Sequence, residues 1–85
     1  MRNPTTVTII YQGRSQACTR IVAAQQAAKA ESAARALRDS MAARHAAHAA
    51  KPVTSAREQA DADARTLADI ARYDAIASAC RAALV

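Results

Sequence analysis

Residues 5–12, with the sequence TTVTIIYQ, alternate two sets of side chains as a β-strand does. Val7, Ile9 and Tyr11 fall on one side of such a strand, and Ile10 falls with the threonines on the other. The β-branched residues in this segment also favour extended backbone geometry. This first segment is therefore predicted to be a strand.

A hairpin is expected directly after this strand. Gly13, the one glycine of the chain, permits a positive φ angle and suits a turn. We expect Gly13, Arg14 and Ser15 to form a three-residue loop, after which the chain returns as a second strand. In that register Val7 would lie opposite Ile21, and one face of the hairpin would be consistently apolar.

Residues 16–22 also allow a second interpretation. Ser15 is a residue type that caps the start of helices, so a helix could begin there instead of a strand. The first strand would then have no partner within the chain and would need one from another molecule. The apolar face that a hairpin creates favours the hairpin.

Residues 24–51 contain strong helix formers and neither glycine nor proline, so they are predicted to form a long helix. Its apolar positions recur in steps of four and three residues, which is the spacing of a coiled-coil seam. We call these positions the first seam. They are Ala23, Ala27, Ala30, Ala34, Leu37 and Met41.

Residues 52–54 are predicted to be a loop, because the residue before Pro52 is pushed out of helical geometry. A second helix is predicted at 55–84, and Ser55 and Glu58 have the spacing of a capping box at its start. The apolar positions of this helix again step by four and three, and we call them the second seam. They are Thr66, Ile70, Tyr73, Ala77, Cys80 and Leu84.

The predicted fold class is α+β, mainly α, in a single domain that covers residues 1–85: a β-hairpin or strand region at 1–22, then an antiparallel helical hairpin. The short loop forces the two helices to run antiparallel. Matching their heights places bulky Tyr73 against Ala30 of the first seam, and it brings Arg44 level with Asp61.

Composition limits how much core this fold can build. Alanine accounts for 26 of the 85 residues, Leu, Ile and Val together for 12, and Phe and Trp are absent. Seams of alanine allow close helix packing but bury little apolar area, so a monomer would be marginally stable. We therefore expect self-association, most simply as a homodimer.

Positive charge is concentrated in the first half of the chain. Residues 1–51 carry eight Lys or Arg side chains against two acidic ones, whereas residues 52–85 carry four against five. Such a surface attracts an acidic protein or nucleic acid. The candidate partner-binding residues combine basic side chains of the first helix with apolar side chains that flank the seams or face outward. They are Arg35, Arg38, Arg44, His48, Lys51, Ile10, Leu67 and Ile76.

The sequence offers little for catalysis or metal binding. The histidines at 45 and 48 would lie about 30 Å from Cys18 and Cys80, at the other end of the helical hairpin. A rod of two helices also provides no phosphate loop and no concave site for a catalytic triad. We expect no enzymatic activity, no metal and no cofactor, and we expect the two cysteines to be unbonded.

Location is predicted from what the chain lacks. The sequence has no run of about 20 apolar residues and no basic-then-apolar start typical of a signal peptide. We expect a cytoplasmic protein with reduced thiols that does not bind membranes.

In size and composition the chain resembles accessory proteins of bacteriophages and mobile elements in bacteria of high genomic GC content, including anti-CRISPRs and inhibitors of host machinery. This resemblance implies a non-enzymatic module that binds and blocks a host protein. Two alternatives are a nucleic-acid-binding module and a small structural or assembly subunit. Nucleic-acid binding is the less favoured, because single-strand binders use aromatic stacking platforms and this chain has only Tyr11 and Tyr73.

Overall fold

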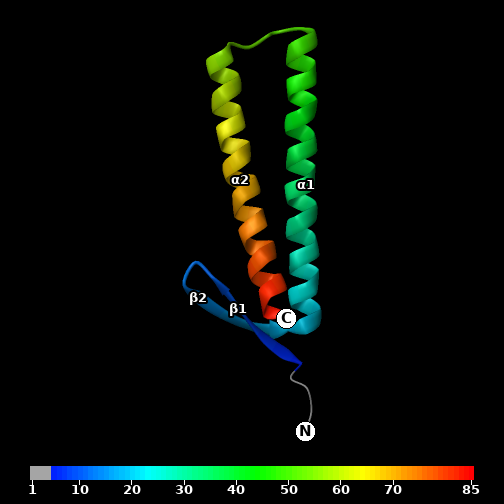
Figure 1. Ribbon diagram of the computed structural model, residues 1–85, viewed down its shortest axis with the longest axis vertical. Helices are drawn as coiled ribbons and strands as arrows, with labels where there is room; N and C mark the ends of the chain where they lie inside the picture. Colours follow the sequence, from blue (N-terminus) through cyan, green and yellow to red (C-terminus); the bar gives the residue numbers. More distant parts are fainter. Residues whose placement is uncertain (1–4) are drawn as a thin grey trace.

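The computed structural model describes residues 5–85, which form a β-hairpin followed by a helical hairpin (Figure 1). The strands are β1 (Thr6–Tyr11) and β2 (Arg14–Thr19), and the helices are α1 (Arg20–Ala50) and α2 (Ala56–Ala83). The helices lie antiparallel, and the β-hairpin lies at the end where α1 begins and α2 finishes. The predicted α+β, mainly α class is confirmed; the part of the predicted domain at 1–4 lies outside the described residues.

A two-residue turn joins the strands of the β-hairpin. Gln12 and Gly13 have φ angles of 52° and 76°, and two positive φ angles in succession are typical of a type I′ turn. The twist of this turn matches the twist of the strands that it connects. The predicted three-residue loop is therefore wrong, and so is its register: Val7 pairs with Cys18 instead of Ile21.

Helix α1 begins about four residues earlier than predicted, because Thr19 caps it. The Thr19 side chain accepts a hydrogen bond from the backbone N–H of Val22 at 3.1 Å, which satisfies one of the free donors of the first turn. Ile21 and Val22, expected in the second strand, instead lie exposed in this turn. The alternative helix start is also wrong, since Ser15 lies within β2.

The two predicted seams face each other along the helices. The buried residues of α1 all belong to the first seam, and those of α2 all belong to the second. They are Ala23, Ala27, Ala30 and Ala34 on α1, and Thr66, Ile70, Ala77 and Cys80 on α2. Tyr73, by contrast, is only half-buried, so Ile70, with 5% of its surface exposed, is the bulky side chain that the second seam encloses.

The loop between the helices covers residues 51–55, slightly more than predicted. Helix α1 ends where the backbone N–H of Lys51 donates to the carbonyl of Ala47 at 2.9 Å. Helix α2 is capped by Ser55, whose hydroxyl accepts from the backbone N–H of Glu58 and donates to the Glu58 carboxylate, both at 3.1 Å. The predicted pairing of Ser55 and Glu58 at the helix start is confirmed.

The β-hairpin is held against the helices by an apolar cluster. Ile9 is 6% exposed and packs with Ala23 and Ala27 of α1 and Cys80 of α2. The Arg20 guanidinium donates to the carbonyl of Leu84 at 2.9 Å and links the start of α1 to the residue that caps the end of α2. Neither helix within residues 5–85 has the combined length and apolarity needed to cross a bilayer.

Candidate functional site

Ion pairs connect the two helices along one side of the helical hairpin, and we call it the ion-paired side. The described residues of α1 and α2 are bridged there at three levels. The bridges are Glu31–Arg81 at 2.7 Å, Arg38–Asp74, and Arg44–Asp63 at 3.0 Å. Glu31, Arg38 and His45 follow one another in steps of seven residues, so they line one flank of the first seam. The charged side chains that form these bridges are therefore already paired within the chain.

Arg44 reaches a different acid from the one expected. We predicted that it would lie level with Asp61, but its guanidinium contacts Asp63 and donates to the Thr66 hydroxyl at 3.3 Å. At 100° per residue, Asp61 lies about 200° around α2 from Asp63 and is exposed on the outer face. Arg44 lies across the seam and can meet only acids on the inner side of α2.

These pairs also set the ionisation of the acids involved. The hydrogen bond with His45, followed by the one from Arg44, lowers the pKa of Asp63 below its ordinary value. The hydrogen bond from Arg81 lowers the pKa of Glu31, and Glu31 in turn raises the pKa of Arg81. All three groups therefore remain charged over a wider pH range than in the unfolded chain.

Asp63→Asn is expected to remove a pH-dependent part of the stability. Because the pKa of Asp63 is lower in the folded chain, folding favours the ionised carboxylate. This contribution is complete above the unfolded pKa of about 3.9 and disappears as the pH falls through the lower folded value. The difference in Tm between wild type and variant should be present at about pH 5 and shrink toward about pH 2.

Thermal denaturation followed by circular dichroism between these two pH values measures this difference. Asp61→Asn is the control, because it removes an exposed carboxylate two residues away on the same helix. Its effect on Tm should be small throughout. A difference for Asp63→Asn that persists undiminished to the lowest pH would contradict the proposed role of the ion pair.

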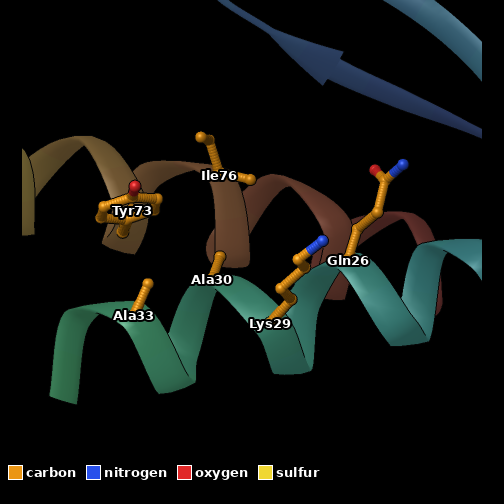
Figure 2. Close-up of a pocket in the computed structure, with 6 residues that line it drawn as sticks. All are labelled: Gln26, Lys29, Ala30, Ala33, Tyr73 and Ile76. Atoms are coloured by element: carbon orange, nitrogen blue, oxygen red, sulfur yellow. The ribbon is translucent and has the colours of Figure 1, made fainter. Parts of the chain in front are cut away.

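The opposite flank of the first seam carries uncharged side chains, and we call it the groove side. Gln26, Ala33, Ser40 and Ala47 follow one another there in steps of seven residues. An open groove of about 280 Å³ lies on this side, and its walls are mostly apolar. Figure 2 shows Ala30 and Ala33 pointing from α1 toward α2, from which Tyr73 and Ile76 border the groove. Lys29 lies on the α1 rim.

The end of the rod at the loop between the helices brings three predicted residues together, and we call it the tip. Arg44, His48 and Lys51 line one hollow of about 230 Å³ there. Val53 belongs to the same hollow and is 78% exposed. The Nδ1 atom of His48 lies 3.4 Å from the hydroxyl of Thr54. The tip therefore combines basic side chains with an exposed apolar residue.

The remaining predicted partner-binding residues are spread over the molecule. Ile10, 66% exposed, lies in the β-hairpin, at the opposite end of the rod from the tip. Ile76 borders the groove, whereas Leu67, 52% exposed, lies on the other flank of the second seam. Nine residues make two and a half helical turns, so the two side chains point in opposite directions around α2. Arg35 is exposed on α1. The eight residues therefore do not form one continuous surface.

Three features of these surfaces were not predicted from the sequence. Val53 follows Pro52 in the predicted loop, and because loops run over the protein surface, its apolar side chain could have been expected to be exposed. Tyr73 was assigned to the seam, but it contributes to the groove wall. The uncharged residues at 26, 33, 40 and 47 could have been found by extending the seven-residue spacing to the flanks of the seam.

The cysteines and histidines offer no assembled site within residues 5–85. Cys18 and Cys80 are free thiols, and burial raises the pKa of Cys80, which lowers its reactivity. His45 pairs with Asp63, while His48 lies in the tip. No group of three or more potential metal ligands gathers among these residues.

Comparison of the chain with protein families, with curated proteins and with solved structures found no match.

Proposed function

We propose that the protein is a non-enzymatic protein-interaction module that binds an acidic surface of a partner protein through its tip. The observation that carries this proposal is the convergence of His48 and Lys51 around one hollow beside exposed Val53, with the ion-paired Arg44 in the wall of the same hollow. Basic side chains steer an acidic partner toward the tip and set the selectivity. Burial of Val53 against the partner then slows its release.

The distribution of charge supports a local contact at the tip instead of a contact along the whole of α1. Arg38 and Arg44 are each compensated by an acid of α2, so the helix presents less free charge than its sequence suggests. Lys51 is exposed at the end of α1, and no acidic partner of its side chain occurs among the described residues. A protein with a small acidic patch fits this pattern better than a nucleic acid, which rewards many phosphate contacts.

The resemblance in size and composition to accessory proteins of phages and mobile elements bears on the class of partner. It favours a host protein, and the module would inhibit that protein by covering part of its surface. Such an inhibitor needs a stable binding surface and no reacting group of its own.

The test compares Lys51→Glu with Arg35→Glu in a capture experiment. Each substitution reverses one exposed charge, at the C-cap of α1 for Lys51 and within α1 for Arg35, and only Lys51 lies at the tip. The immobilised chain is incubated with bacterial lysate in the presence of nuclease, and bound proteins are quantified by mass spectrometry. We expect a bound protein that the Lys51→Glu variant loses by about tenfold or more and that the Arg35→Glu variant retains.

Two outcomes would contradict the proposal. Equal losses for the two variants would mean that the tip is not the binding surface. Binding that nuclease removes, and that weakens steeply as salt is raised, would instead support a nucleic-acid-binding module.

A further inference from the structure

The groove side is a long face of the helical hairpin on which the described residues form no ion pair between the helices, and the β-hairpin cluster covers only its end near Ile76. Apart from Lys29 on the rim, the α1 flank of this face is uncharged at four successive heptad positions, from Gln26 to Ala47. Docking on the opposite side would require partial burial of three half-exposed ion pairs, which carries a desolvation penalty. A partner that needs apolar contact therefore fits the groove side better.

The surface of the chain is larger than that of an ordinary folded protein of its mass. The chain exposes 6282 Å², whereas a folded monomer of 8.9 kDa exposes about 4,800 Å². The four residues outside the described range account for no more than about 700 Å² of this excess, even at full exposure. About 800 Å² remains, which is the area that each partner buries in an interface of standard size.

The groove places small side chains beside large ones. Its floor on α1 is made of Ala30 and Ala33, and its ridge on α2 is made of Tyr73 and Ile76 at the same height along the rod (Figure 2). A two-fold contact places the same face of both copies together. When the two-fold axis runs parallel to the helices, α2 of each copy lies over α1 of the other. The large side chains of each copy then meet the small side chains of its partner.

We infer that the groove side is the interface between two copies of this chain, in which the Tyr73 and Ile76 ridge of each copy packs on the alanine floor of the other. The result is a four-helix bundle in which every pair of neighbouring helices is antiparallel. The groove and the tip hollow share no lining residue, so substitutions in the groove alter self-association and substitutions of Lys51 or Val53 alter binding of a target protein.

The experiment is sedimentation equilibrium at about 50 µM for the wild type, Ala33→Glu and Ala28→Glu. Ala33 lies in the groove, whereas Ala28 is an exposed alanine on α1 that points away from α2, so the two variants match in chemistry and in helix. We expect a wild-type species of twice 8.9 kDa. Ala33→Glu should weaken association at least about tenfold because its charge is buried in the interface, and Ala28→Glu should leave association unchanged.

A mixing experiment separates loss of the interface from loss of the fold. Ile76→Lys places a positive charge where the proposed contact puts position 33 of the other copy. Ala33→Glu and Ile76→Lys should each be weakly associated alone, and an equimolar mixture should recover a dimer through the pair of opposite charges. Misfolding of either variant would not be repaired in this way.

Three results would overturn the inference. They are a wild-type chain that sediments at 8.9 kDa at this concentration, equal effects of Ala33→Glu and Ala28→Glu, and a mixture that fails to recover the dimer. The first of these would leave the tip free to bind a target as a monomer, and capture that depends on Lys51 would still be observed. Failure of the inference is thus distinguishable from failure of the proposed function.

Discussion

Ile9→Ala is expected to lower the free energy of unfolding by about 2 to 5 kcal/mol, the usual range for truncation of a buried aliphatic side chain. Ile9 is 6% exposed and is the β-hairpin residue at the centre of the cluster with Ala23, Ala27 and Cys80. These neighbours are small and cannot move far enough to fill the space that the side chain leaves. Urea denaturation followed by circular dichroism measures the loss.

Ile10→Ala is the matched control, since it removes the same atoms from the next residue along the strand. Ile10 is 66% exposed, so its truncation should change the free energy of unfolding by no more than about 0.5 kcal/mol. Similar losses for the two variants would mean that the β-hairpin is not seated through Ile9. A loss confined to Ile10→Ala would indicate that the opposite face of the hairpin is the buried one.

Ala27→Leu is expected to destabilise the chain by about 1 to 3 kcal/mol through overpacking. Ala27 has no exposed surface and lies where α1 meets both α2 and the β-hairpin. A leucine there has no space, so the helices must separate or the β-hairpin must shift. For a domain of this size, each kcal/mol lowers Tm by roughly 4 to 8 °C, which thermal denaturation resolves easily.

The neighbouring substitution Ala28→Leu provides the comparison, because it adds the same side chain to an exposed position. Alanine and leucine are both good helix formers, so the substitution hardly changes the intrinsic helical tendency of α1. We expect Tm to stay close to that of the wild type. If Ala27→Leu were tolerated as well as Ala28→Leu, the alanine seam would not be the close contact that the structure shows.

The helices and their seams were predictable because each seam residue repeats a strong periodic signal. Ala23, Ala27, Ala30 and Ala34 are spaced by four and three residues within a segment of good helix formers, and all four are buried. The capping pair of Ser55 and Glu58 is equally local, so its geometry also followed from the sequence. Contacts within one element, or between elements joined by a short loop, leave few alternatives.

The register of the β-hairpin, by contrast, depends on the conformation of a single turn residue. Loops of two and of three residues both accept Gly13, and only the backbone of Gln12, with its positive φ, distinguishes them. The choice of loop shifted every cross-strand pair and released Thr19 to cap α1. A single turn residue in an uncommon conformation is not visible as a pattern in the sequence.

The candidate site was predicted in part for a similar reason. Arg44, His48 and Lys51 lie on successive turns near the end of one helix, so their convergence follows from helical geometry. The acid that pairs with Arg44 did not follow, because a long side chain can span about one helical turn and several acids lie within that reach. Leu67 and Ile76 were grouped as flanking residues, although their nine-residue separation already places them on opposite sides.

The burial of Cys80 beneath the β-hairpin gives the chain a native chemical probe of its own local opening. The thiol is 1% exposed, and burial raises its pKa, so in the closed state it is shielded from labelling reagents and weakly ionised. Alkylation of Cys80 therefore requires the strands to lift from the helix ends. Its rate relative to that of an unprotected thiol gives the free energy of lifting, separately from that of global unfolding. Cys18 lies in β2, which moves with the strands, and it is only half-buried. Its alkylation rate therefore provides an internal comparison for the rate at Cys80.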